Sequence, residues 1–589
     1  MLKKLILSLG IIAIIIPANS CKKYLTVEPV STFGPDYVFS NVTNATEAVL
    51  GAYAALTGDN GYGIRLNMYF GYDDDNIEGQ AATPYPDNDR RSIAHYSTTA
   101  INAQIDAPFN QLFAGAERAN QCIYYIPKMA LFNSTTDLVG RAQVRRLYGE
   151  ALTLRAQFYF ELIRNWGDIP VQYAPTFTQT NLLPPRTDRD AIYDHLLNDL
   201  LIAEQIVPWR TAAGTSDSRI TCGAVRALRA RIALFRAGWS LRQSGIMQQG
   251  SNPKTYYQIA MNECDTIITL HSADHSLNPS YKNVFKTLDA GQPDVTYGEV
   301  LWQVTFGGGT GTSDSKLGYY DGPTYTPASS KGNAALTILP SYFYLFDSTD
   351  ARRDVTIAPY NITTSALSIA ATAIYKMNEG KFRRDWIPNA TQSTGQYFGA
   401  SWPLIRYSDV LLMYAEADNE VNGAPSGKAV TALQMVSARG HNNNNSLAVT
   451  PPTNHDGFFQ AVFKERSLEL GGEAIRKYDL IRWNLLASTL ATTKQTLTDM
   501  ANSVDDAAGT WSSYPKTMDY LAASTTTTGV EWVNSFYVSY SGGAIPWLSG
   551  GIANSILAEY AIDFKANHSE LLPIPQAARD ANPNLTQNP

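Results

Sequence analysis

Residues 149–170 read GEALTLRAQFYFELIRNWGDIP and complete the clearest helical pattern in the chain. The apolar residues of this pattern recur at intervals of three and four positions, at Leu147, Ala151, Leu154, Phe158 and Leu162. That spacing places them on one face of an amphipathic helix. Gly167 stands where helices commonly end, and Pro170 prevents the helix from continuing. The stretch therefore predicts a helix over residues 141–166.

The same kind of spacing recurs on both sides of this helix. It predicts further helices over residues 42–56, 109–129, 190–207, 223–238, 256–270, 407–421, 427–439 and 456–470. Consecutive helices of this length favour a tetratricopeptide-like array, although long insertions break its period. The predicted fold class is mainly α. Tetratricopeptide-like helix pairs would form an α/α superhelical scaffold with long irregular loops and a few short strands.

Three regions lack helical periodicity. Residues 281–400 are rich in Gly, Ser, Thr and Tyr, and we expect loops, short helices and a few strands there. The apolar run 299–306 is the clearest strand candidate in this region. Residues 490–560 and the tail 571–589 are predicted to be mostly irregular. Loops this long in a compact chain usually carry function.

The composition indicates a globular protein without an affinity for nucleic acid. Of the 589 residues, 44% are hydrophobic and 17% are charged, and the formal net charge is −7. This balance excludes a disordered chain and leaves no basic field for nucleic acid. Cys122, Cys222 and Cys264 lie in or beside helical patterns. We expect them to be buried as small apolar side chains, without disulfides or zinc.

The N-terminus has the pattern of a secretory signal. Lys3 and Lys4 precede a twelve-residue apolar run, 5–16, which is too short to span a bilayer. Small residues then lead to Cys21, which suggests cleavage after Ser20 and lipidation of the Cys21 thiol. The alternative is an ordinary signal peptide with an incidental cysteine. Since no later segment has about 18 consecutive apolar residues, a lipid anchor would be the only membrane attachment.

Five blocks of sequence resemble, in the same order, those of the SusD/RagB family of outer-membrane nutrient-binding lipoproteins of Bacteroidota. They are SCKKYL at 20–25, the opening stretch at 149–170, IRYSDVLLMYAEADNE at 405–420, ERSLELGGEAIRKYDLIRWN at 465–484 and LPIPQAARDANPNLTQNP at 572–589. One departure is Ala474, where the family commonly has Gly.

The resemblance implies a SusD-like fold and a division of the chain. The expected parts are a signal peptide (1–20), a lipidated N-terminal tether (21–40), an N-terminal SusD-like helical region (41–280) and a SusD/RagB C-terminal region (281–589) packing on the same scaffold. It also implies a surface-exposed, lipid-anchored protein of the outer membrane. Such a protein captures oligosaccharides for a SusC-like TonB-dependent transporter and has no catalytic activity. The RagB branch, which binds peptides, and a purely structural lid without a ligand remain as alternatives.

Carboxylates in these blocks raise a different alternative, a glycoside hydrolase, because such enzymes use paired carboxylates. Arginines stand close by in the same blocks, so we expect ion pairs between packed helices instead. The residues expected in these structural ion pairs are Arg406, Asp409, Glu416, Glu465, Arg466, Glu469, Arg476, Asp479 and Arg482. The hydrolase alternative requires two unpaired carboxylates facing a cleft.

Two short patterns could hold a metal ion, but neither is complete. His271, Asp274 and His275 form H-x-x-D-H, yet the predicted helix ends at Leu270 and no third ligand is evident. Asp73, Asp74 and Asp75 could bind calcium, but the spacing of an EF-hand loop is missing. We therefore expect no metal and no cofactor.

Aromatic loops are the best candidates for a ligand site, because rings can cover the flat faces of sugars while polar side chains bind the hydroxyl groups. Rings cluster in residues 62–85, 319–325 and 386–402. The candidate ligand-binding residues are Tyr62, Tyr72, Asp73, Asp74, Tyr85, Arg90, Tyr319, Tyr320, Tyr325, Trp386 and Trp402. The alternative for each ring is packing inside the core of a loop.

Overall fold

The fold is seen in a computed structural model that describes most of the chain after residue 33. The described residues are 34–80, 87–214, 217–306, 311, 313–326, 332–362, 369–372, 374–388, 395–503, 517–520, 534–535, 544–546 and 554–589. The predicted signal peptide, Cys21 and Tyr85 lie outside them.

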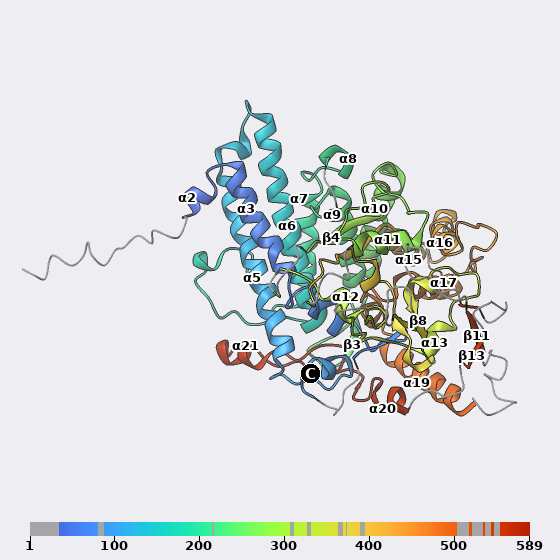
Figure 1. The fold of residues 1–589 in the computed structure, drawn as a ribbon. Coiled ribbons are helices and arrows are strands. Elements are labelled where there is room, and N and C mark those ends of the chain that lie inside the picture. The colour runs from blue at the N-terminus through green and yellow to red at the C-terminus, as the bar shows by residue number, and fades with distance from the viewer. Residues whose placement is uncertain are drawn as a thin grey trace, which may run out of the picture.

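The first half of the molecule is a stack of long helices (Figure 1). They are α3 (Val42–Tyr53), α5 (Ala103–Tyr125), α6 (Leu138–Trp166), α7 (Arg189–Ala203), α9 (Cys222–Ala237) and α10 (Pro253–Leu270). Each helix from α5 onward packs on the next long helix in the chain, and α3 packs on α5 and α6. The six helices expected in this half are all present, which confirms the mainly helical fold class.

The second half continues the same stack. Its long helices are α15 (Tyr407–Asn422), α16 (Gly427–Gly440), α17 (His455–Leu470) and α19 (Leu486–Ser503). Helix α15 packs extensively on α10, and α16 and α17 pack on α15. The core therefore runs from the first half into the second through the contact between α10 and α15.

Local signals at the helix ends agree with the sequence patterns. The Asn41 side chain accepts a hydrogen bond from the backbone N–H of Asn44 and caps α3. Asp137 Oδ1 accepts from the N–H of Gly140 at 2.7 Å and caps α6, which begins three residues before the predicted start at 141. At the other end of α6, Gly167 has φ of +75° and its N–H donates to the carbonyl of Ile163. A residue with a side chain would be strained at that position.

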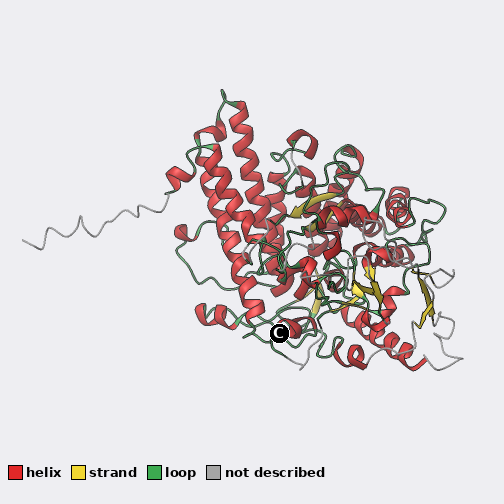
Figure 2. Ribbon diagram, viewed as in Figure 1, coloured by secondary structure: helices red, strands yellow, loops and turns green. Residues whose placement is uncertain are grey.

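The strands are short and scattered (Figure 2). A small sheet has the order β1 (Ile77–Glu78), β5 (Thr337–Ile338), β9 (Asn378–Glu379) and β6 (Ile357–Ala358). The expected strand in 299–306 is β4 (Val300–Val304), which pairs antiparallel with β10 (Trp402–Arg406). The remaining pairs and ribbon are β2 (Trp239–Leu241) with β3 (Met247–Gln249), β7 (Tyr360–Ile362) with β8 (Ile369–Ala371), and β12 (Asn534–Ser535), β11 (Thr517–Tyr520) and β13 (Ala544–Pro546).

Short helices fill the connections between the long ones. They are α2 (Pro35–Val38), α4 (Arg90–Ala94), α8 (Arg210–Ala213), α11 (Tyr281–Asp289), α12 (Leu317–Tyr320), α13 (Pro340–Phe343), α14 (Arg353–Thr356), α18 (Arg476–Arg482), α20 (Asn554–Glu559) and α21 (Gln576–Ala581).

The expectation that 490–560 is mostly irregular is wrong at its start, where α19 is helical as far as Ser503. Leu490, Leu497 and Met500 lie seven and three positions apart, and all three are buried. The repeat sits among threonines and alanines, so the apolar stripe is too sparse to stand out in the sequence. Packing of this face against the core stabilises the helix in spite of its weak pattern.

The three cysteines of the described chain lie in its interior. Cys122, Cys222 and Cys264 are free and buried, as expected. Across the part of the chain that the structure describes, no helix is both long enough and apolar enough to cross a bilayer.

Candidate functional site

Several of the candidate ligand-binding rings are buried, which corrects the hypothesis that they meet a ligand. Tyr62 lies in the core, where its hydroxyl donates to the carboxylate of Glu161. Tyr72 is also buried, and its hydroxyl donates to the carbonyl of Gly472 at 3.2 Å. Both hydroxyls bind residues far away in the sequence, Glu161 on α6 and Gly472 in the turn after residue 470, and both rings are buried, so they have no free face for a sugar.

The same correction holds for three rings later in the chain. Tyr325 is buried and pairs its backbone with Gly332 at 3.0 and 2.8 Å. Trp402 belongs to β10 and stacks on Phe382 with 4.9 Å between ring centroids. Trp386 is buried beneath the guanidinium of Arg383, 4.5 Å from its ring centroid.

Asp73 and Asp74 are buried too, and they hold the loop that follows Tyr72. Asp73 accepts from the N–H of Gly79 and of Ala561, both at 2.8 Å, and contacts His95 Nδ1 at 2.8 Å. Asp74 Oδ1 accepts from the N–H groups of Asn76 and Ile77. These buried carboxylates accept hydrogen bonds from the backbone of the protein, so the hypothesis that they bind ligand is wrong.

The side chains of the short metal-like patterns are also engaged in contacts within the protein. His271 Nδ1 contacts Asp274 Oδ2 at 3.0 Å, whereas His275 Nδ1 faces the carbonyl of Gly298 at 2.8 Å. Asp75 pairs with Arg476 at 2.7 Å. Within the described residues, no group of three or more His, Cys, Asp or Glu side chains is placed to hold a metal ion.

A different set of side chains gathers around a rare π-helical turn, η3 (Arg65–Tyr69). Such turns occur frequently at functional sites. Lys316 Nζ donates to Asp59 Oδ2 at 2.8 Å, and the hydroxyl of Tyr397 donates to the same oxygen at 3.0 Å. The Lys316 amine also lies 5.0 Å from the centroid of the Tyr397 ring. Three loops that are far apart in the sequence therefore meet at Asp59.

Further members of this set interact with Tyr69. Arg65, Arg90, Lys316 and Tyr320 all act on its hydroxyl electrostatically. Burial raises the pKa of Tyr69 to about 12, although the three cations oppose this rise. The net rise in pKa shows that burial outweighs the three nearby cations.

Short backbone and side-chain contacts hold this set in place. The N–H of Asp59 donates to the carbonyl of Gly311 at 2.7 Å, and that of Lys316 donates to the carbonyl of Gly63 at 2.9 Å. Arg65 Nε donates to Gln104 Oε1 at 2.8 Å, which ties η3 to the first turn of α5. Arg90 Nε donates to Gln80 Oε1 at 2.6 Å.

Among the predicted rings that the structure describes, Tyr319 and Tyr320 remain half-exposed. They lie at the end of α12 and meet edge to face, with 4.8 Å between their centroids. We call the whole set the ring-and-charge site. It comprises Asp59, Arg65, Tyr69, Arg90, Lys316, Tyr319, Tyr320 and Tyr397.

Of the candidate residues, the structure brings Arg90, Tyr319 and Tyr320 to this site. Tyr69 and Tyr397 belong to the aromatic clusters of the sequence, but nothing there distinguishes them from their buried neighbours. Asp59, Arg65 and Lys316 are single charged residues in loops, and no sequence signal marks them. Their roles depend on contacts between residues as far apart as 59 and 316.

The nine residues expected in structural ion pairs all form them. Asp409 contacts Arg231 at 2.6 Å and Arg466 at 2.7 Å, and Glu416 pairs with Arg482. The other pairs are Glu465–Arg352, Glu469 with Arg352, Arg406 and Arg439, Arg406 with Glu299 and Glu473, Asp479 with Arg466 and Arg482, and Arg476–Asp75.

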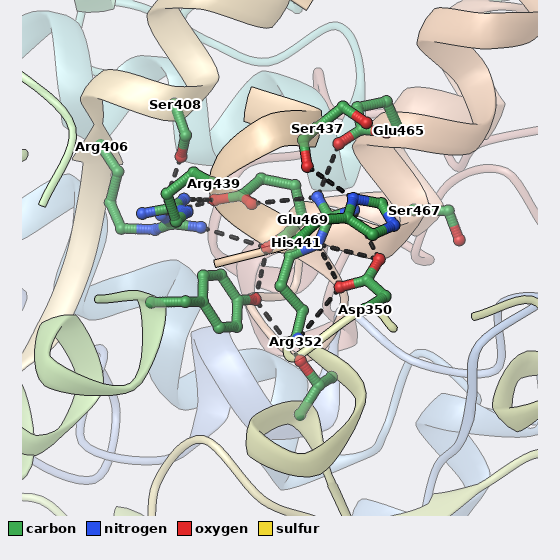
Figure 3. A network of polar contacts seen from close by, with 12 residues as sticks. Asp350, Arg352, Arg406, Ser408, Ser437, Arg439, His441, Glu465, Ser467 and Glu469 are labelled. Atoms are coloured by element: carbon green, nitrogen blue, oxygen red, sulfur yellow. Dashed lines mark hydrogen bonds and ion pairs between the residues drawn. The ribbon is translucent and has the colours of Figure 1, made fainter. Parts of the chain in front are cut away.

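Figure 3 shows the centre of this network, where the side chains of Arg352, Arg406 and Arg439 converge on Glu469. Asp409, Glu416, Glu465 and Glu469 are all buried and paired with arginine. A hydrolase needs two carboxylates that reach its substrate. These four cannot serve that purpose, so the alternative fails for the residues that suggested it.

Comparison with known proteins agrees with this architecture. A model of the SusD family matches residues 298–589, and a model described as "Starch-binding associating with outer membrane" matches residues 39–234. Among curated proteins, SusD-like protein P25 of Formosa agariphila is 23% identical over 496 residues, covering 79% of this chain and 88% of that protein.

Solved structures show the same fold. A SusD homolog from Bacteroides thetaiotaomicron has a TM-score of 0.75 at 22% identity, covering 94% of this chain and 98% of that one. A laminarin-binding SusD-like protein has a TM-score of 0.63 at 19% identity, covering 93% and 99%. Surface glycan-binding protein A from Bacteroides thetaiotaomicron, in complex with laminarihexaose, has a TM-score of 0.63 at 16% identity, covering 93% and 99%.

The chain belongs to the SusD-like family. This is a family of carbohydrate-binding proteins without catalytic activity, and one of its models is named for association with the outer membrane.

Proposed function

We propose that this chain is a surface-exposed lipoprotein of the outer membrane, anchored through Cys21, that captures oligosaccharides at the ring-and-charge site. It then delivers them to a SusC-like TonB-dependent transporter. Family membership supports glycan capture, and two structural neighbours are named for binding laminarin or laminarihexaose.

The observation that carries this proposal is the grouping of half-exposed rings with hydrogen-bonding side chains. Tyr319, Tyr320 and Tyr397 can each cover a sugar face. Burying roughly 40 Å² of apolar sugar face at about 25 cal/mol/Å² is worth about 1 kcal/mol per ring. Rings alone therefore give weak binding. Hydrogen bonds from Arg65 and Lys316 to hydroxyl groups would bring the affinity into the micromolar to millimolar range, about −4 to −8 kcal/mol.

A binding screen of the mature chain, beginning at Lys22, tests glycan capture. Affinity electrophoresis and calorimetry would compare laminarin and starch with other soluble polysaccharides and a mixed peptide pool. We expect retardation and heat from one class of glycan. Heat from peptides and none from glycans would contradict the proposal and favour a peptide carrier, whereas silence with both would favour a structural lid.

The anchor is tested separately, because it does not depend on the ligand. Cys21→Ala removes the thiol that would carry the lipid, so we expect the variant to move from the membrane fraction to the soluble fraction. Retention of the variant in membranes of cells lacking the transporter would contradict lipidation of Cys21.

A further inference from the structure

A group of aromatic rings, two of them exposed and two partly buried, lies far from the ring-and-charge site, where the described chain begins. Phe39 follows α2 and stacks on Tyr125 at the end of α5, with 5.0 Å between centroids. Phe177, in the short turn η6 (Thr176–Thr178), stacks on Tyr125 at 5.9 Å and meets Tyr124 edge to face at 5.6 Å. We call Phe39, Tyr124, Tyr125 and Phe177 the aromatic patch. Figure 1 shows α2 at the margin of the helical stack, beside α3 and α5.

The patch is open to solvent although its members contact one another. Phe177 is 59% exposed and Tyr124 is 36% exposed, and the neighbouring Tyr37 on α2 is 54% exposed. The Lys128 amine lies 3.0 Å from the centroid of the Tyr124 ring, which adds a cation to the patch. Grouped rings that stay exposed on a soluble protein mark an interaction surface.

The patch is also held rigidly. The N–H of Thr176 donates to Glu117 Oε1 at 3.1 Å, which fixes the turn carrying Phe177 to α5. Asn120, one turn further along α5, donates to the carbonyl of Gln172 at 2.8 Å. The rings therefore need little ordering when a partner binds.

We propose that the aromatic patch rests on the lipid surface of the membrane to which Cys21 is anchored, and so orients the protein. This inference relies on the lipid anchor of the proposed function. Twelve residues lie between Cys21 and Gly34, where the described chain begins, so the thirteen steps along the chain can span at most about 45 Å.

The chemistry of the patch matches the boundary between lipid and water. Tyrosine rings prefer this boundary because one end is apolar and the other is polar. Lysine can extend its amine toward the headgroups while its methylene stem covers apolar surface. Because the tether holds the two partners together, the patch needs only weak affinity to stay in contact.

This contact would place the ligand site away from the membrane. Gln104 lies in the first turn of α5 and accepts a hydrogen bond from Arg65 of the ring-and-charge site. Tyr124 lies near the other end of this helix. Twenty residues at 1.5 Å each separate the two positions by about 30 Å along the helix. The site would then open toward the medium, where oligosaccharides arrive.

Single introduced cysteines provide the test. The native Cys122, Cys222 and Cys264 are buried, and burial raises the pKa of Cys122 to about 12 and of Cys222 to about 11, so they resist labelling. The lipidated full chain would carry a fluorophore at Phe177→Cys or, as a control, at Leu270→Cys. Leu270 is 70% exposed at the end of α10.

Each labelled chain would be reconstituted in vesicles of phosphatidylcholine and phosphatidylglycerol. We expect iodide quenching of the probe at 177 to fall at least about threefold on reconstitution, and that of the probe at 270 to stay unchanged. If reconstitution changed the iodide quenching of both probes by the same factor, the inference would be overturned. Shielding at 177 in membranes of the producing cell, but not in protein-free vesicles, would also overturn it, because the patch would then bind a membrane protein.

Flotation of the same vesicles separates this inference from the anchor. The Tyr124→Ser/Phe177→Ser double variant should still float with lipid and still bind glycan. A probe at Tyr37→Cys should be protected from iodide in the otherwise wild-type chain. In the double variant this probe should lose the protection. If the wild-type chain, produced from its full sequence, fails to float, the anchor is wrong. If it floats with the probe unprotected, only the patch inference is wrong.

Discussion

At the scale of single residues, Glu469 explains how this protein keeps charges inside its core. Burial opposes ionisation, but Arg439, Arg406 and Arg352 outweigh it and lower the pKa of Glu469 to about 2. The carboxylate is therefore charged throughout the physiological range. A buried ion pair of this kind contributes little relative to an apolar core, but removing one partner leaves the other charges uncompensated.

Glu469→Gln should therefore destabilise the protein at pH 7 by about 3–5 kcal/mol. Because the folded pKa of about 2 lies below the unfolded value, the contribution of Glu469 is complete above about pH 5. It is lost as the pH falls toward 2, so the difference between wild type and variant should shrink in acid. Urea unfolding followed by circular dichroism at several pH values measures this.

The control is Lys464→Gln, which removes an exposed charge from the same helix, α17. Its effect should stay within about 0.5 kcal/mol. A Glu469→Gln penalty that does not change with pH would contradict the role of the ionised carboxylate.

Tyr320 tests the ring-and-charge site. Its ring is half-exposed, so Tyr320→Ala should weaken glycan binding about fivefold through the lost apolar contact, with little change in Tm. Calorimetry with the glycan found in the screen measures this. Tyr37→Ala removes an exposed ring outside the site and should leave the affinity unchanged. A large loss of stability in Tyr320→Ala would instead identify the ring as part of the core.

At the scale of single elements, the ends of α6 and α15 show why two similar glycines have different importance. Both follow a long helix with positive φ, +75° at Gly167 and +72° at Gly423. A Cβ on Gly167 would lie 2.3 Å from Arg189 Nη2 and 2.8 Å from Leu571 Cδ1, whereas nothing lies within 4 Å of one on Gly423. Gly167 is thus required by both its backbone conformation and its neighbours.

Gly423→Ala should lower the free energy of unfolding by about 1 kcal/mol, because an alanine in the left-handed region is strained by roughly this amount. Gly167→Ala should cost about 3 kcal/mol, since its ψ of −132° is strained for alanine and Arg189 must also move. Guanidinium unfolding of the two variants side by side measures the difference. Equal penalties would show that neither the ψ of Gly167 nor the contacts with Arg189 and Leu571 add to the cost.

At the scale of the whole molecule, polar contacts join the two halves of the chain. Arg231 on α9 contacts Asp409 on α15 at 2.6 Å and donates to the carbonyl of Leu404 at 2.7 Å. Tyr478 donates to Asn165 on α6 at 2.7 Å. Together with the packing of α10 on α15, these contacts make the stack a single unit.

Thermal unfolding should therefore give one calorimetric transition. Arg231→Met should lower its Tm by about 2 °C without splitting it, because a penalty of a few kcal/mol is spread over a large unfolding entropy. Lys254→Met, which changes an exposed residue on the adjacent α10, should leave the Tm in place. Two separate transitions would show that the halves unfold independently.

The sequence by itself determined the helices and the class of protein. Long apolar stripes such as the one from Leu147 to Leu162 depend on residues three and four apart, so they can be recognised without knowing the fold. The pairing of Asp409 with Arg466 and of Glu416 with Arg482 was also predictable, because both charges occur in these blocks. The partners Arg231, Arg352 and Arg439 lie outside the blocks, and only the fold brings them to the network. Where the stripe was sparse, as in α19, the pattern failed.

Only the tertiary structure decided which rings are available to a ligand. Tyr62, Tyr72, Tyr319 and Tyr320 occur in similar loops, but the first two are buried by distant helices and the last two remain half-exposed. Asp59, Lys316 and Tyr397 come together from three separate loops, and no local pattern encodes their meeting. Burial depends on the whole chain, and for that reason helices follow from local spacing whereas the binding site does not.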